Sequence, residues 1–249
     1  MVRPIIAGNW KMNKTIPEAV GFAAGLRAAL TNPPDREVII APPFTALHAV
    51  GEALRGSVIQ LAAQNLHEAE KGAFTGEISG AMLRDAGCSY VLVGHSERRS
   101  LFGETDDRVN RKLISSLAVG LKPIFCIGEL LRQRQAGETE AVVGGQLKEG
   151  LNNLTAGDIR HLIIAYEPVW AIGTGQTASP QQAQDIHRFI RQWIAEQYGP
   201  KSAAEIAILY GGSVTPKNIA ELLARPDING ALVGGASLDV DSFVQIVTS

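Results

Sequence analysis

Residues 162–198 hold the stretch that decides the fold: LIIAY at 162–166, EPVWAIGTG at 167–175 and SPQQAQDIHRFIRQWIAEQY at 179–198. The first piece is a short, continuous apolar run, which is typical of a parallel strand covered on both faces. In the last piece a serine hydroxyl comes directly before a proline, and this pair favours the start of a helix with the proline in its first turn. The stretch therefore predicts a strand, a loop and a helix in that order.

The same order recurs along the whole chain. Working outward from 162–166, the apolar runs are 4–9 (PIIAGN), 37–41 (EVIIA), 58–63 (VIQLAA), 90–94 (YVLVG), 123–128 (PIFCIG), 206–210 (IAILY) and 230–234 (GALVG). Thr215-Pro216 before KNIAELLA repeats the helix-start signal. Parallel strands need crossover connections, which helices supply. We expect an α/β fold with eight parallel strands, a (β/α)8 barrel, in a single domain over 1–249 because no linker interrupts the series; an open, doubly wound sheet is the alternative.

Composition excludes several classes of protein. Apolar residues make up 45% and charged residues 19%, which is ordinary globular usage and excludes a disordered chain. The net charge of −2 provides no positive field for nucleic acid. No run approaches the length of a membrane span and no signal peptide is recognisable, so we expect a soluble, cytoplasmic protein. Cys88 and Cys126 lie in or beside apolar runs, as buried small hydrophobes do, and no close-set Cys/His cluster predicts a metal.

Unusual polar residues close two of the apolar runs, at the edge where both candidate folds bind ligands. Asn9 and Lys11 follow the first run. His95 follows the fourth and precedes Ser96, which we expect to cap a short helix, so that the imidazole would lie at the positive end of that helix. A neutral imidazole there can donate a proton to a substrate oxygen and take one back. A turn amide, a solvated lysine and a structural histidine are the alternative readings.

The sixth run ends in a carboxylate followed by a loop suited to motion. Glu167 stands at the strand end, and Pro168, Val169, Trp170, Ala171, Ile172, Gly173, Thr174 and Gly175 follow it. The stiff start, apolar middle and glycine-flanked end are the parts of a lid that can exclude water. An apolar cover would strengthen Glu167 as a base. A solvated glutamate beside an ordinary loop is the alternative.

Paired glycines close the last two runs. Gly211-Gly212 precede Ser213, and Gly234-Gly235 follow the eighth run. Such pairs allow a close approach of the backbone and leave N–H groups free to bind an anion, and the loops after the seventh and eighth strands of barrels commonly bind phosphate. The segment 173–178 also matches a dinucleotide-binding pattern, but six residues separate it from its strand, so we treat that match as accidental.

Together these segments resemble the triosephosphate isomerase family of TIM barrels. The resemblance covers nearly the whole chain and is carried, in order, by AGNWKMN, AQN with GAFTGE, VGHSERR, CIGE, AYEPVWAIGTG, YGGSV and LVGGASL. It implies an aldose–ketose isomerase of glycolysis and gluconeogenesis that interconverts dihydroxyacetone phosphate and D-glyceraldehyde 3-phosphate through a cis-enediol(ate), without metal or organic cofactor.

The resemblance also implies a role for each site residue. Glu167 would move the proton between substrate carbons, His95 would serve the two oxygens, Asn9 and Lys11 would stabilise negative charge, and Glu97 would hold Lys11. Phosphate would bind Gly173, Ser213, Gly234 and Gly235, and Ile172 with Leu232 would clamp the base. These assignments are similar to those of the family and do not follow from spacing alone.

Family members are typically homodimers, in which the loop after the third strand enters the neighbouring subunit. The matching residues here are Gln64, Asn65, Phe74, Thr75, Gly76 and Glu77, with Thr75 at the expected tip. Two departures, Lys14 and Gln176, bear on dimer strength and lid kinetics. Two other functions remain open on the residues alone. One is another phosphate-binding barrel, such as an aldolase using Lys11 as an imine-forming lysine, and the other is a catalytically silent binding protein.

Overall fold

A computed structural model describes residues 2–31, 35–172 and 177–249 of the chain. Its strands are β1 (Ile5–Asn9), β2 (Glu37–Ala41), β3 (Ile59–Ala63), β4 (Tyr90–Val93), β5 (Lys122–Ile127), β6 (Ile163–Tyr166), β7 (Ala207–Tyr210) and β8 (Gly230–Val233). Its α-helices are α1 (Ile16–Ala29), α2 (Leu47–Leu54), α3 (Gly80–Asp85), α4 (Ser96–Leu101), α5 (Asp106–Ala118), α6 (Leu131–Gln135), α7 (Thr139–Gly150), α8 (Ala156–Ile159), α9 (Pro180–Glu205), α10 (Ile219–Leu223) and α11 (Val240–Thr248). Short 3-10 turns are η1 (Phe44–Ala46), η2 (Val169–Ala171) and η3 (Gly235–Leu238).

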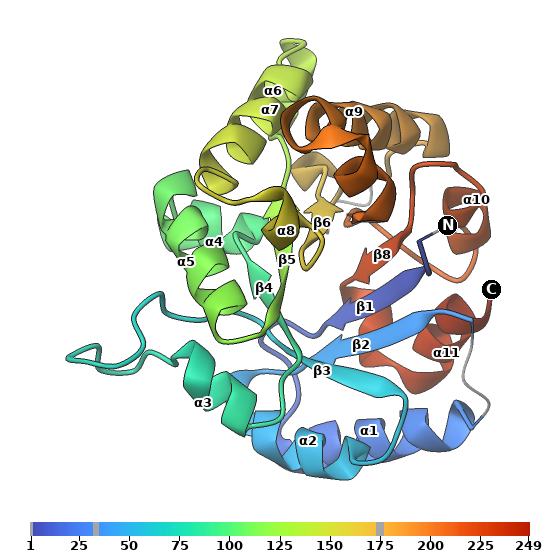
Figure 1. Cartoon of the computed structure of the whole chain (residues 1–249). Helices are drawn as coiled ribbons and strands as arrows, with labels where there is room; N and C mark the ends of the chain where they lie inside the picture. Colours follow the sequence, from blue (N-terminus) through green and yellow to red (C-terminus); the bar gives the residue numbers. More distant parts are fainter. Residues whose placement is uncertain (1, 32–34, 173–176) are drawn as a thin grey trace.

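The eight strands form a closed parallel barrel in sequence order, with the helices around it (Figure 1). β1 closes the ring by pairing with β2 on one side and β8 on the other, where Ile5 is in register with Glu37 and with Gly230. Each strand lies within one residue of its predicted run. The barrel prediction is confirmed, and closure excludes the open sheet.

The apolar strand residues serve two cores because successive side chains point to opposite faces. One set fills the barrel interior and includes Ile39, Leu92 and Cys126, while the other packs between strands and helices. Both cysteines are buried and free, as expected. Closure also depends on one glycine, since a Cβ at Gly230 would lie 1.8 Å from the Ile5 carbonyl oxygen and its φ is +144°.

The two helix-start signals had different outcomes. Ser179 caps α9 by accepting from the Gln182 N–H, as predicted, and the regular helix is interrupted at Gly199. The prediction at Thr215-Pro216 was wrong by three residues, because α10 begins at Ile219. The Asn218 side chain accepts from the Thr215 N–H at 2.8 Å, so residues 215–218 form a local turn ahead of the helix.

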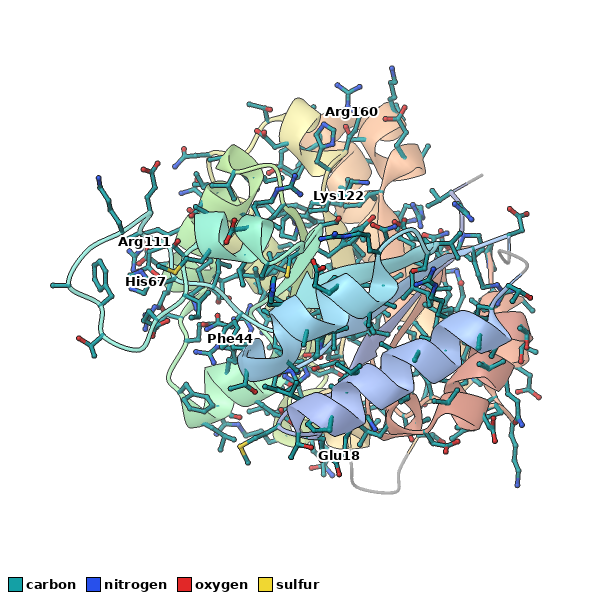
Figure 2. The ribbon with its side chains drawn as sticks, turned by 90° about the horizontal axis from the view of Figure 1, so that it is seen from below. Glu18, Phe44, His67, Arg111, Lys122 and Arg160 are labelled. Atoms are coloured by element: carbon teal, nitrogen blue, oxygen red, sulfur yellow. The ribbon has the colours of Figure 1, made fainter. Side chains whose placement is uncertain are left out.

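A long connection between β3 and α3, residues 64–79, extends well away from the barrel and is called the arm below (Figure 1). Residues 71–77 are exposed, whereas His67 is buried at the base and stacks on Phe74 with ring centroids 4.1 Å apart. Glu68 lies 3.7 Å from the Arg111 guanidinium, and His67 and Arg111 are neighbours in the side-chain view (Figure 2). The arm is thus braced at its base and free at its tip.

None of the helices in the described residues has the length and apolarity needed to cross a membrane.

Candidate active site

A cavity of about 430 Å³ lies at the carboxyl ends of the strands and brings most of the predicted site residues together. Those that line it are Asn9, Lys11, His95, Glu167, Ile172, Ser213, Leu232, Gly234 and Gly235. Glu97 lies beside it, on an adjoining cavity that Gln64 and Asn65 also line. The predicted roles of Gly173, Thr174 and Gly175 fall outside the described residues. Residues from both ends of the sequence thus surround one volume.

Glu167 and His95 form the buried pair of the site. The His95 Nε2 atom lies 3.0 Å from Glu167 Oε1, and the other carboxylate oxygen accepts from the Ser96 N–H at 3.0 Å. Only 2% of Glu167 and 6% of His95 are exposed. The Glu167 N–H donates to the Ile127 carbonyl at 2.7 Å, which fixes the main chain of Glu167 beside the end of β5. The carboxylate is therefore held between a ring nitrogen and a backbone amide.

His95 is itself the N-cap of α4, so the prediction that Ser96 caps this helix was wrong by one residue. His95 has an extended backbone (ψ 141°), while Ser96 is already helical, and His95 Nδ1 accepts from the Glu97 N–H at 3.2 Å. A ring nitrogen that accepts a hydrogen bond carries no proton, so in the neutral ring the proton is on Nε2. That atom faces Glu167 and the cavity as a donor.

Lys11 reaches the site from a strained backbone. Its φ is +53°, which is uncommon for any residue but glycine. The Asn9 Oδ1 accepts from the Lys11 N–H at 3.0 Å, and Gln64 Nε2 donates to the Lys11 carbonyl at 2.8 Å. The Lys11 ammonium lies 2.5 Å from Glu97 Oε1. These contacts hold the ammonium at the cavity, and they also give Gln64, expected only at a dimer interface, a contact within its own chain.

The glycines after β7 and the glycines after β8 contact different parts of the site. The prediction that the Gly211 N–H is free for an anion was wrong, since it donates to the Tyr166 carbonyl at 2.7 Å. A Cβ at Gly211 would lie 2.8 Å from Glu167 Cγ, so this position is small to make room for the carboxylate side chain. At the eighth strand end, a Cβ on Gly234 would lie 3.8 Å from Lys11 Cε. The backbone of Gly234 thus lies beside the Lys11 side chain.

The first half of the predicted lid is anchored by a residue to which the sequence reasoning gave no role, Glu129. Its carboxylate is fully buried and accepts from Tyr166 at 3.1 Å and from Trp170 Nε1 at 2.9 Å, while its carbonyl accepts from the Val169 N–H at 3.1 Å. Burial, and then the charge of Glu129, raises the pKa of Tyr166, so the phenol stays a donor. The signal was present as a glutamate one residue after a strand tip, in CIGE.

Among residues 2–31, 35–172 and 177–249, no three His, Cys, Asp or Glu side chains are grouped so that they could hold a metal ion.

A closed parallel barrel with a carboxylate, an imidazole and an ammonium around one cavity at its carboxyl end defines a TIM-barrel enzyme. The family model described as triosephosphate isomerase matches residues 4–249. Curated proteins named triosephosphate isomerase from Endomicrobium trichonymphae, Moorella thermoacetica and Carboxydothermus hydrogenoformans are 53%, 56% and 54% identical over 247 residues, which is 99% of this chain and 98% of each relative. The chain belongs to the triosephosphate isomerase family.

Proposed function

We propose that Glu167, His95, Lys11 and Asn9 carry out the reaction of this chain, which is the interconversion of dihydroxyacetone phosphate and D-glyceraldehyde 3-phosphate. The observation that carries the proposal is the 3.0 Å approach of His95 Nε2 to Glu167 Oε1 inside a cavity that Lys11 also lines. A base, a neutral donor and a cation are the groups that a proton transfer beside a carbonyl requires.

In this mechanism Glu167 removes a proton from one substrate carbon and returns it to the adjacent carbon. The His95 Nε2–H donates to the carbonyl oxygen as negative charge develops there, and the ring then moves protons between the two oxygens. The Lys11 ammonium and the Asn9 amide stabilise the enediolate. When a substrate oxygen accepts the hydrogen bond of His95 Nε2–H, Glu167 no longer shares that donor. Its carboxylate is then free to remove the proton from carbon, so substrate binding and activation of the base are coupled.

The phosphate of the substrate is proposed to bind at the other end of the cavity, on Ser213, Gly234, Gly235 and Gly173. Main-chain N–H groups suit a dianion because they donate without adding a mobile charge. The approach of Gly234 to Lys11 supports this assignment, since a Cβ at Gly234 would lie 3.8 Å from Lys11 Cε, the carbon that carries the ammonium. Energy from the non-reacting phosphate can then favour closure of the lid.

Closure of the lid, 168–175, is proposed to exclude water from the enediolate, with Ile172 and Leu232 covering the base. Both of these side chains already line the cavity. Shortening the lid is expected to let the intermediate lose phosphate, which is measured as methylglyoxal formation. A shortened lid that released no more methylglyoxal than the intact chain would argue against this role.

The chain is proposed to form a homodimer. The tip of one arm, at Thr75, would enter the cavity of about 240 Å³ beside Glu97 in the other subunit. Exposed large apolar side chains line this cavity, including Met12 (95%) and Phe102 (66%), and Phe74 is exposed on the arm. Light scattering tests the dimer: Phe102→Glu should halve the mass of the particle, whereas a wild-type chain that runs as a monomer would contradict the proposal.

The experiment that tests the chemistry is a coupled assay on D-glyceraldehyde 3-phosphate, with and without borohydride. Isomerisation through an enediolate leaves no imine, so borohydride with substrate should leave the activity and the mass of the chain unchanged. Covalent trapping on Lys11 would favour an imine-forming barrel, and binding without turnover would favour a silent protein.

A further inference from the structure

We infer that Lys14 is a positioning residue, which sets the distance between the Lys11 ammonium and the glycine loop at the phosphate end of the site. The inference rests on the proposed function and concerns two segments: loop 1, residues 10–15, which carries Lys11, and loop 8, residues 234–238, which carries Gly234 and Gly235. Both segments line the same cavity, through Trp10, Asn13 and Leu238 among others.

A single side chain joins the two loops. Lys14 Nζ donates to the Leu238 carbonyl at 2.8 Å, across 224 positions of sequence. Leu238 is the last residue of η3, which begins at Gly235. The lysine therefore holds the far end of the turn whose first residues are the proposed phosphate contacts.

The anchor is rigid on the side of loop 1 as well. The Lys14 ammonium lies 4.8 Å from the centroid of the Phe22 ring and 5.6 Å from that of Trp10, within the range of cation–π attraction. Trp10 is fully buried and packs edge-on against Phe22 at 4.8 Å. The two rings thus fix the position of the Lys14 ammonium. Through its hydrogen bond to Leu238, the ammonium in turn fixes the position of loop 8.

The backbone of Lys14 is strained in this position. Its φ is +72°, in the left-handed region that glycine adopts freely and a lysine does not. Glycine would relieve the strain at this position but would supply no ammonium for Leu238. The hydrogen bond from the Lys14 ammonium to Leu238 joins the two loops, and it is the feature that explains a lysine here.

Lys11 and the glycine loop must act on one substrate at the same time. If Lys14 did not hold loop 8 against loop 1, the glycine amides could shift relative to Lys11. The phosphate would then bind less well, while the His95–Glu167 pair, which neither loop contains, would keep its geometry. Lys14 therefore affects recognition of the phosphate and not proton transfer.

The test compares Lys14→Met, Lys14→Arg and Lys14→Gly with the wild-type chain, using D-glyceraldehyde 3-phosphate, unphosphorylated D-glyceraldehyde, and inorganic phosphate as the inhibitor. In Lys14→Met we expect KM for the phosphorylated substrate and the inhibition constant of phosphate to rise together about tenfold, with a much smaller change in kcat. The kcat/KM for glyceraldehyde should stay at the wild-type value. Lys14→Arg keeps the donor and should restore both constants.

Each outcome decides the inference. Lys14→Gly should resemble Lys14→Met; if it resembles the wild type, backbone strain and not the anchor governs this position, and the inference is wrong. Equal losses on both substrates would show a general structural defect, and wild-type constants in Lys14→Met would also overturn the inference. A wild-type chain without isomerase activity would instead refute the proposed roles at the site, so the two failures are distinguishable.

Discussion

The two ends of the active-site cavity differ in the groups that line them, which are side chains at one end and mainly backbone at the other. At the end where we propose acid–base chemistry, called the acid–base end below, Glu167 and His95 are buried side chains whose polar atoms contact backbone amides and each other. At the end where we propose phosphate binding, Gly234 and Gly235 offer backbone, and Lys11, which is 28% exposed, is proposed to serve both ends. Proton transfer needs atoms fixed within a fraction of an ångström, whereas a dianion needs only several donors around it. The comparison predicts that changes at the first end affect kcat and that changes at the second affect KM.

The largest effect is expected from Glu167→Asp. Withdrawing the carboxylate by about one methylene misplaces the base, and a shift near 1 Å can cost roughly 10² or more in kcat. Steady-state kinetics measures the loss, and the inhibition constant of inorganic phosphate serves as the control because it should not change. Turnover at the wild-type rate would remove Glu167 from the mechanism.

His95→Gln is expected to lower kcat by roughly 10², the lower part of the range for a lost acid–base group. Glutamine keeps an N–H donor but cannot pass a proton between two substrate oxygens. Phosphate inhibition should again stay near the wild-type value. If affinity and rate fall together, the two ends are not independent and the comparison fails.

The buried imidazole of His187 allows a test of stability that is separate from catalysis. It is fully buried, its ring lies 5.9 Å from that of Tyr166, and burial lowers its pKa from 6.5 to about 4. The folded chain therefore binds this proton less readily than the unfolded chain, so the contribution to stability is present above pH 6.5 and is lost as the pH falls toward 4. Between pH 7 and pH 5 the free energy of unfolding should drop by roughly 2 kcal/mol on this account.

Urea unfolding at the two pH values measures this effect. His187→Gln should show a smaller drop than the wild type and near-normal kcat at pH 7, while the exposed His48→Gln should keep the full drop. The same pH dependence in His187→Gln and in the wild type would contradict the assignment.

The smallest effect is expected at Gly211→Ala, where the added methyl would meet Glu167 Cγ at 2.8 Å. The Glu167 side chain has to shift to admit the methyl, so we expect kcat to fall about tenfold with little change in KM. Gly145→Ala is the matched control, because a Cβ there meets nothing within 4 Å. A rise in KM alone would place Gly211 with the phosphate end.

The fold could be predicted almost fully from the sequence, because continuous apolar runs of strand length recur in a regular order. The runs do not reveal closure by themselves. It depends on contacts such as Gly230 against Ile5, which join positions 225 residues apart and leave no local pattern.

Residues that surround the cavity could be predicted where an unusual residue stood at a strand end, as with Glu167, His95 and Lys11. Predictions failed where the identity of a hydrogen-bond partner decided the outcome. Composition cannot show that the Gly211 amide is used by Tyr166, that His95 caps its own helix, or that Glu129 holds Trp170. Lys14 shows the same limit, since its partner Leu238 is known only once the barrel has closed.

The ring of strands has no structural beginning. β1 and β8 pair as neighbours (Figure 1). Arg36 links residues near both ends of the sequence, because its carbonyl accepts from Arg3 at 3.1 Å and its guanidinium donates to the Ser249 carbonyl at 2.9 Å. A rearranged gene that joined these ends by a short linker and opened the chain in a surface connection would encode the same barrel in another order. The barrel architecture therefore does not require the strands to follow one another from the starting point that this sequence gives them.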